Sequence, residues 1–194
     1  MGLEARPLAR RLARLSGVRV IRVGIGVRWP PDLGAAGTVI VCGVGGALSA
    51  DLEPGTVFVP DRLALSSGGS VELDPGLGAE LRGAVARLGI DAAAGGLLTA
   101  TRMVTGAERR EWARRGFHLV DMETGLVAAS GRRLAGIRVV LDTPRHELSP
   151  RWGRPGRAAL DPRLWGQMVW LARFAPAYAD RAARVVAEAL RHRA

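Results

Sequence analysis

The chain has 194 residues, of which 48% are apolar, and a formal net charge of +10. This length suits one domain with a substantial core, and the composition excludes disordered and fibrous proteins. No apolar run reaches the roughly 18 to 20 residues that cross a bilayer, and the arginine-rich N-terminus lacks the apolar segment of a secretory signal. Because Cys42 is the only cysteine, a disulfide framework is also excluded, and we expect a cytoplasmic protein.

The positive charge is concentrated at the two ends of the chain. Residues 1–30 hold seven arginines against one acid, and residues 145–194 hold ten against four, whereas the stretch between them is slightly negative. Every one of the 28 basic residues is arginine, as GC-rich coding would also produce, and no nucleic-acid-binding motif accompanies them. We therefore expect no nucleic acid as a partner, while the basic ends are suited to an anionic membrane surface or a phosphate-bearing ligand.

In the first half of the chain, the apolar periodicity predicts helices and strands in alternation. A helix is expected over residues 6–15, and a proline-containing loop over residues 29–37. Glycines follow two of the expected strands, at residues 24–26 and 43–46. The strands are expected at residues 18–23, 38–42 and 56–60, and a second helix at residues 78–88.

The second half continues the alternation and ends in a helical tail. Helices are expected at 107–115 and 124–135, strands at 95–101, 117–120 and 137–141, and a loop at 143–160. Two further helices, 162–174 and 177–192, are expected to be divided near Pro176. This order predicts an α/β protein with a mixed, mostly parallel sheet covered by helices on both faces. The sequence shows no internal repeats and no domain boundary. We therefore expect residues 1–194 to form one domain with a basic helical tail from about residue 162.

Two acidic residues follow buried strands. Glu123 lies where the strand at 117–120 passes through Asp121 and Met122 into a helix, and Asp142 ends the strand at 137–141. Open α/β sheets bind their ligands at the carboxyl ends of the strands. One carboxylate could therefore hold a polyol while the other handles a proton.

Four segments, in order, resemble the purine nucleoside phosphorylase and nucleosidase superfamily, and within it the hopanoid-associated nucleoside phosphorylase-like proteins. The resemblance implies a single three-layer domain and an enzyme that cleaves the N-glycosidic bond of a purine nucleoside. The tail, with Leu164-Trp165 and its arginine-rich helices, is similar to the same group. The segments are the glycine loops at 2–6 and 23–26, the glycine strand at 43–48 with 52–57 behind it, and the acidic motifs at 120–123 and 138–142.

The resemblance implies a role for each residue of the acidic motifs. Asp142 would be the catalytic acid, protonated near purine N7, which requires enough burial to raise its pKa. Glu123 would stay ionised and accept hydrogen bonds from the ribose hydroxyls, and Met122 would pack against the sugar. Met103 falls in the segment that lines the base pocket, and Gly45 in the glycine strand that binds the substrate.

The resemblance also implies a phosphate site near the N-terminus. Gly2 and Gly26 belong to loops whose backbone amides approach phosphate closely. The position four residues after the first-loop glycine is arginine in phosphorylases and glutamate in many hydrolases of the superfamily, and here it is Arg6. We therefore expect phosphorolysis, with inorganic phosphate as co-substrate and no other cofactor. We expect no metal site, because the three histidines are dispersed.

Two alternative functions remain open at this point. The first is a hydrolytic nucleosidase of the methylthioadenosine/S-adenosylhomocysteine or futalosine type. The second is a catalytically inactive nucleoside-binding or scaffold protein. For an active enzyme, the hopanoid resemblance implies a 5′-substituted adenosine such as adenosylhopane as substrate.

The sequence departs from the family pattern in four places. It starts at the first loop, where the family has a strand, so we expect the first strand of the sheet to be missing. The segment between Gly26 and Thr38 leaves hardly any room for the usual helix. Between Glu123 and Asp142 the spacing is about one helical turn short, and Leu141 replaces a serine, so the placing of Asp142 needs to be checked first.

Each of these residues also has a purely structural interpretation. Asp142, before Thr-Pro, could cap a turn, and Glu123 could be an acid favoured in the first turn of a helix. Arg6 could belong to the solvated face of a basic helix. Arg138, in the middle of a buried strand, is expected to pair with an acid, and Cys42 to be a core thiol.

Apolar side chains share one face of the expected tail helices, namely Leu164, Trp165, Met168, Leu171 and Ala175, with Trp170 and Phe174 beside them. Such a face is typical of core packing or of contact between subunits, and we expect a homo-oligomer. A tryptophan-rich face flanked by arginines also suits peripheral contact with a membrane.

Overall fold

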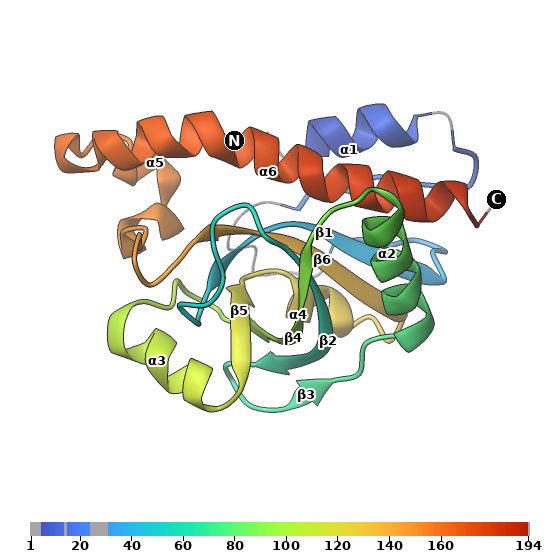
Figure 1. Cartoon of the computed structure of the whole chain (residues 1–194), viewed down its shortest axis with the longest axis horizontal. Helices are drawn as coiled ribbons and strands as arrows, with labels where there is room; N and C mark the ends of the chain where they lie inside the picture. Colours follow the sequence, from blue (N-terminus) through green and yellow to red (C-terminus); the bar gives the residue numbers. More distant parts are fainter. Residues whose placement is uncertain (1–4, 14, 24–30, 194) are drawn as a thin grey trace.

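The computed structural model describes residues 5–13, 15–23 and 31–193, with side chains from residue 8 onward (Figure 1). The strands are β1 (Thr38–Ala47), β2 (Val57–Leu65), β3 (Ser70–Val71), β4 (Ala92–Thr99), β5 (Phe117–Asp121) and β6 (Arg133–Asp142). The α-helices are α1 (Ala5–Leu12), α2 (Pro75–Arg87), α3 (Gly106–Arg114), α4 (Thr124–Ala128), α5 (Pro155–Ala158) and α6 (Trp165–Arg191). Two 3-10 turns, η1 (Pro150–Gly153) and η2 (Pro162–Leu164), flank α5.

The strands form one mixed sheet in the order β3-β2-β4-β5-β1-β6. The longest registers are parallel, between β1 and β6 and between β2 and β4. The pairs β1–β5, β2–β3 and β2–β6 are antiparallel. The predicted α/β fold with a mixed sheet and flanking helices is therefore confirmed.

The β2–β6 pairing also closes the sheet into a ring, because these two strands are otherwise at its opposite sides. Every strand of the ring contributes to one buried cluster, which includes Ala47, Phe58, Leu97, Leu119 and Val140. Their side chains fill the space that the ring encloses. This apolar filling holds the carboxyl ends of β1 and β6 beside β5.

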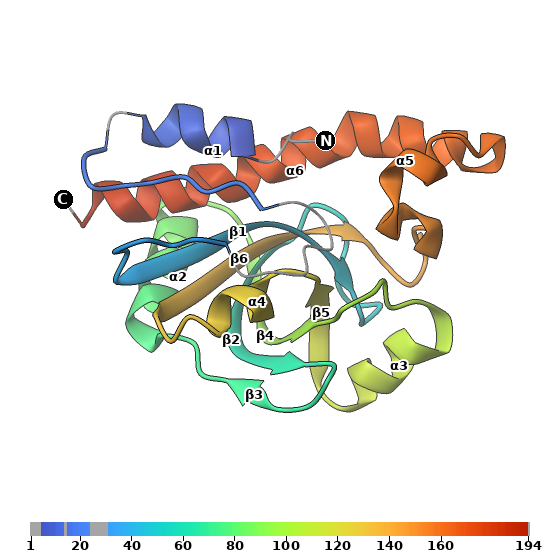
Figure 2. The same ribbon diagram turned by 180° about the vertical axis from the view of Figure 1, so that it is seen from behind.

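Helices α6 and α1 lie on one side of the ring, and α3 lies on the opposite side (Figures 1 and 2). A second buried cluster joins the ring to α2 and α6 through Leu77, Leu81, Ile137, Val139 and Val185. Figure 2 shows α1 running beside the second half of α6. None of the helices in the described ranges is both long and apolar enough to span a bilayer.

An N-terminal cap explains where α2 begins. Asp74 accepts a hydrogen bond from the Leu77 amide at 2.9 Å and precedes Pro75, so α2 starts there. The same carboxylate pairs with Arg133 at 2.6 Å, which ties α2 to the first residue of β6. The hydrogen bond from Arg133 lowers the pKa of Asp74 to about 2.

Several sequence predictions differ from the structure. Residues 18–23 form no strand, and none precedes β1 in the described ranges. The helix expected at 124–135 ends at Ala128, because Gly131 turns the chain at a φ of 65° and residues 133–135 pair with β1. The glycines at 43–46 lie within β1 and not after it.

The tail forms one helix where two were expected, because α6 continues through Pro176. A proline at this position costs a backbone hydrogen bond, so packing must hold both halves in line. The rings of Trp170, Phe174 and Tyr178 lie 5.3 to 6.5 Å from one another and span the proline on one side. After Pro176, the second half of α6 is buried against the closed sheet.

Candidate functional site

A cavity of about 1080 Å³ lies between the ring and α6, and five of the predicted site residues line it. Its walls come from β1, β5 and β6, from the segment after β4, and from both halves of α6. The sequence thus identified residues that the fold brings together, although they are far apart along the chain. These five residues are Gly45, Met103, Met122, Glu123 and Asp142.

The predicted phosphate site falls mostly outside the described residues. Gly2 and Gly26 are not among them. The backbone of Arg6 belongs to α1, and its side chain lies outside the described part. Phosphate binding by these three residues therefore stays a prediction.

Asp142 is the last residue of β6 and is buried, with 4% of its surface exposed. Its Oδ2 accepts hydrogen bonds from Arg109 Nη2 at 2.5 Å and from the Leu148 amide at 3.1 Å. Its Oδ1 accepts no hydrogen bond from the described residues and lies 2.7 Å from the position that a Cβ on Gly46 would take. The glycine in the paired strand therefore leaves room for this carboxylate oxygen, and both Gly46 and Asp142 line the cavity.

The partner of Asp142, Arg109, is the site residue that the sequence did not reveal. Arg109 lies on α3 with only 2% of its surface exposed. Its Nε donates to the Val104 carbonyl at 2.9 Å, and its Nη1 donates to the Ala47 carbonyl at 2.8 Å. Glu147 approaches the same Nε at 3.0 Å. In the sequence, Arg109 belongs to the charged run Glu108-Arg109-Arg110-Glu111, which gives no sign that one arginine points inward.

The surroundings of Asp142 act on its proton in opposite directions. Burial disfavours the carboxylate and raises the pKa of Asp142 above its ordinary value, and this influence is the largest. The Arg109 charge and the hydrogen bonds from Arg109 and Leu148 act against burial, whereas the nearby charge of Glu147 adds to it. The net direction is upward, so Asp142 can retain a proton at a higher pH than an exposed aspartate.

A buried polar network fixes the end of β5 next to this site. Asp121 accepts hydrogen bonds from Arg138 Nη2 at 2.5 Å and Nε at 2.9 Å, and from Thr99 Oγ1 at 2.6 Å. The Thr124 hydroxyl also donates to Asp121. The expected pairing of Arg138 with an acid is thus confirmed, and Asp121, two residues before Glu123, has a structural role.

Glu123 follows this network directly and is half-buried in the wall of the cavity. It occupies the N-cap position of α4, but its side chain makes no capping hydrogen bond to the helix. Helix capping therefore does not account for this carboxylate. Hydrogen bonds anchor Asp121 and Thr124 on either side of Glu123. They therefore hold the backbone of Glu123 in the wall of the cavity.

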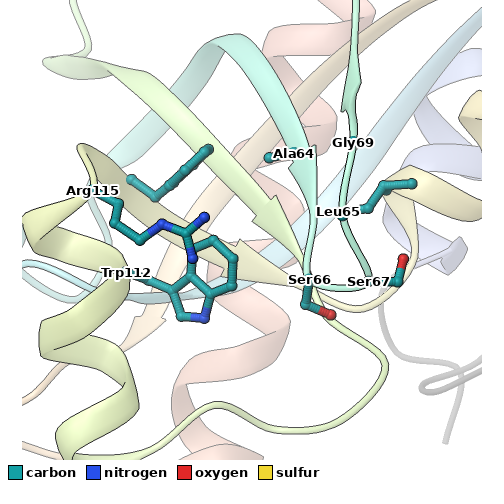
Figure 3. Close-up of a pocket in the computed structure, with 9 residues that line it drawn as sticks. Ala64, Leu65, Ser66, Ser67, Gly69, Trp112 and Arg115 are labelled. Carbon is teal, nitrogen blue, oxygen red and sulfur yellow. The ribbon is translucent and has the colours of Figure 1, made fainter.

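A second pocket of about 350 Å³ lies between the β2–β3 turn and α3 (Figure 3). Figure 3 shows the Arg115 guanidinium over the Trp112 indole, 4.0 Å from the ring centroid. Ser66, Ser67 and Gly69 face them across the pocket. Its lining contains no carboxylate and no imidazole. The carboxylates predicted as site residues, Glu123 and Asp142, line the larger cavity and not this pocket.

Among the residues that the structure describes, no group of three or more His, Cys, Asp or Glu side chains could hold a metal ion. The described lining of the larger cavity contains three carboxylates, Asp121, Glu123 and Asp142, and two buried arginines, Arg109 and Arg138, in a mostly apolar wall. This set suits an organic ligand with a polar centre.

Comparison with solved structures finds nucleosidases of the same fold. The S-adenosylhomocysteine nucleosidase from Streptococcus pyogenes, in complex with 5-methylthiotubericidin, matches with a TM-score of 0.61 and 17% identity over 81% of this chain and 68% of that chain. The corresponding nucleosidase from Neisseria meningitidis, in complex with methylthio-immucillin-A, matches with a TM-score of 0.63 and 18% identity over 81% and 71%.

Futalosine hydrolase of Helicobacter pylori is similar to the same degree, with a TM-score of 0.61 and 17% identity over 80% of this chain and 68% of that chain. No curated protein matches the sequence. The model of the phosphorylase superfamily matches residues 32–149, which is more than half of the chain and includes both candidate carboxylates. The chain therefore belongs to the phosphorylase superfamily.

Proposed function

We propose that this protein cleaves the N-glycosidic bond of an adenine nucleoside. The observation that carries the proposal is the buried Asp142, whose pKa is raised and which lines one cavity together with Glu123 and Met122. Breaking the bond between ribose C1′ and purine N9 leaves negative charge on the base and positive charge on the sugar. A protonated carboxyl can neutralise the base, and general acid help is typically worth about 10²- to 10⁴-fold.

In this mechanism Asp142 donates its proton to purine N7 as the bond to C1′ breaks. Arg109 then lies 2.5 Å from the carboxylate that remains and stabilises its charge. Glu123 accepts hydrogen bonds from the ribose 2′- and 3′-hydroxyls, and Met122 packs against the sugar. Met103 and Gly45 border the space for the base. The similar nucleosidases bound to purine nucleoside analogues support this choice of substrate class.

The size of the cavity supports a substituent on the 5′ carbon of the nucleoside. Ligand pockets commonly measure about 300 to 1,000 Å³, so this cavity, at about 1080 Å³, is slightly larger than the usual range for a whole ligand. Beyond the carboxylates it continues between α1 and α6, where Leu8, Leu12, Ile40, Val186 and Leu190 line it. An apolar 5′ substituent, as in adenosylhopane, matches this lining.

We propose phosphate as the nucleophile, because Arg6 occupies the position at which phosphorylases of the superfamily carry arginine. Attack by a phosphate oxygen on C1′ would yield the free base and a sugar 1-phosphate. The second candidate is hydrolysis, which the likeness to nucleosidases and to futalosine hydrolase favours. A water molecule would then yield the free sugar.

Turnover with and without inorganic phosphate separates the candidates. Purified protein would be incubated with 5′-methylthioadenosine and with adenosylhopane, and adenine and the sugar product would be quantified by chromatography. Phosphate-dependent release of adenine together with a sugar 1-phosphate supports phosphorolysis, and release of the free sugar without phosphate selects hydrolysis. Nucleoside binding without any turnover would mean a non-catalytic protein and would contradict the proposal.

A further inference from the structure

Exposed apolar side chains gather at the start of the C-terminal helix. Leu160, Trp165 and Val169 are 82%, 54% and 65% exposed. Only one other large apolar residue in the described part, Val18 at 36%, is classed as exposed. Isolated exposed apolar residues are ordinary, whereas three within ten residues point to a surface that could bind a partner.

Packing on the inner side of α6 leaves two of these apolar residues, Trp165 and Val169, facing outward. Trp165 and Val169 are four residues apart on α6 and therefore share one of its faces. Met168 and Leu171, on another face, pack against a buried cluster that includes Trp152 and Leu164. Figures 1 and 2 show this first half of α6 extending past the strands of the ring.

Arginines flank the exposed apolar residues along the chain. Residues 150–173 contain one acid, Asp161, which pairs with Arg151. The same range contains five exposed arginines, namely Arg151, Arg154, Arg157, Arg163 and Arg173. We call these five arginines, together with the three exposed apolar residues, the basic apolar surface.

The chemistry of this surface matches an anionic bilayer. Tryptophan and aliphatic side chains insert at the boundary between headgroups and acyl chains, and arginines beside them attract anionic lipids. A soluble acidic partner would match the arginines but would leave Leu160, with 82% exposure, without apolar surroundings. We propose that the basic apolar surface docks the protein on membranes that contain anionic lipids.

The docking surface and the large cavity share α6. Met168, Leu171, Ala172 and Ala175 line the cavity, while Trp165 and Val169 on the same helix do not. If the proposed function holds, a substrate with an apolar 5′ substituent would meet the cavity at the membrane surface. Docking itself rests on the exposed residues and not on the enzymatic activity.

Vesicle sedimentation of the full chain tests the proposal. The probes are vesicles of phosphatidylcholine alone and of equal parts phosphatidylcholine and phosphatidylglycerol. We expect the bound fraction on the anionic vesicles to correspond to about tenfold tighter binding, and to fall as salt screens the arginines. Equal binding to both vesicles, or no binding to either, would overturn the proposal.

Two double variants locate the surface. Trp165→Ser with Val169→Ser removes apolar side chains, and Arg157→Gln with Arg163→Gln removes charge; each should weaken anionic binding about tenfold. Arg114→Gln, at a 74% exposed side chain of α3, is the matched control and should bind as the wild type. Wild-type binding by both double variants would also overturn the proposal.

Two further measurements distinguish the possible failures. Release of adenine from water-soluble 5′-methylthioadenosine should be the same in the Trp165→Ser, Val169→Ser variant, because neither residue lines the cavity. Loss of docking is therefore separable from failure of the proposed function. If sedimentation equilibrium instead shows a dimer that this variant dissociates, the surface is a contact between copies and membrane docking is wrong.

Discussion

Asp142 combines features that an acid catalyst needs and that a turn-capping aspartate does not. One oxygen is held by Arg109 and by the Leu148 amide, while the other accepts no hydrogen bond from the described residues and lies close to Gly46. Burial raises the pKa of Asp142, and Arg109 limits the rise, so that the carboxyl can both keep a proton and release it. The chemistry proposed for the site depends on this balance.

The pH dependence of activity should respond to Glu147. Its negative charge raises the pKa of Asp142, so Glu147→Gln should lower that pKa. Because the acid must be protonated to act, kcat/KM should then decline at a lower pH than in the wild type. The glutamine keeps an oxygen for the Gly106 amide, which now donates to Glu147 at 2.7 Å.

The control for this measurement lies on the same helix as Arg109. Glu111→Gln removes an exposed acid that pairs with Arg114, so the pH profile should stay that of the wild type. A Glu147→Gln profile that is unchanged, or that moves to higher pH, would contradict Asp142 as the group that titrates.

The raised pKa of Asp142 also links stability to pH. Folding favours the protonated form, so the stabilisation is fully present below the ordinary pKa of about 4 and is lost as pH rises through the raised value. The unfolding temperature, followed by circular dichroism, should therefore show a decrease above pH 4 that Asp142→Asn removes. An identical decrease in that variant would assign it to other groups.

At the scale of elements, the glycines of β1 allow three strands to meet around the acid. A Cβ on Gly45 would lie 2.9 Å from the Val120 carbonyl oxygen. One on Gly46 would lie 2.7 Å from Asp142 Oδ1 and 3.2 Å from Arg109 Nη2. The run of glycines that was expected to follow the strand at 38–42 therefore lies inside β1, where it permits close approach of the neighbouring strands.

Gly46→Ala should displace Asp142 and cost about 1–3 kcal/mol of stability. Both adenine release and the free energy of unfolding should fall. Gly37→Ala, just before β1, meets nothing within 4 Å and serves as control. Wild-type activity in Gly46→Ala would show that the close approach of β1 to Asp142 is unnecessary.

Pro176 interrupts the hydrogen bonding of α6, since it cannot donate to the carbonyl of Ala172. Pro176→Ala should restore this bond and raise the free energy of unfolding by about 1–3 kcal/mol, measured by chemical denaturation. Ala177→Gly, at the exposed neighbouring position, should lower it by about 1 kcal/mol. A less stable Pro176→Ala protein would mean that the packed helix requires the proline.

At the scale of the whole molecule, local patterns predicted the elements better than their connections. Alternation of apolar residues revealed the ring strands, because each has a buried face, and strand ends located Glu123 and Asp142. Closure by β2–β6 depends on residues far apart in sequence, Val57 with Val139 for example, and leaves no local signal. Arg109 was missed for the same reason, since only the fold shows that it faces Asp142.

Residues 18–23 and α6 show the opposite limit, in which a local signal misleads. The apolar pattern of residues 18–23 is typical of a strand, but this segment forms no strand in the described structure. Proline is typical of a helix end, but the contacts between the aromatic side chains of Trp170, Phe174 and Tyr178 span Pro176. In the proline-containing helix, tertiary packing outweighs a local preference of a few kcal/mol.

Release of adenine by wild type and by Asp142→Asn is the most direct test of Asp142 as the acid of an adenine nucleoside-cleaving enzyme. Asparagine keeps an oxygen that can accept from Arg109 and Leu148 but cannot donate an acidic proton, so the fold should persist. We predict that the wild type releases adenine from a 5′-substituted adenosine and that Asp142→Asn does so about 10²- to 10⁴-fold more slowly. Release at the wild-type rate by a folded Asp142→Asn protein, or no release by the wild type, would contradict it.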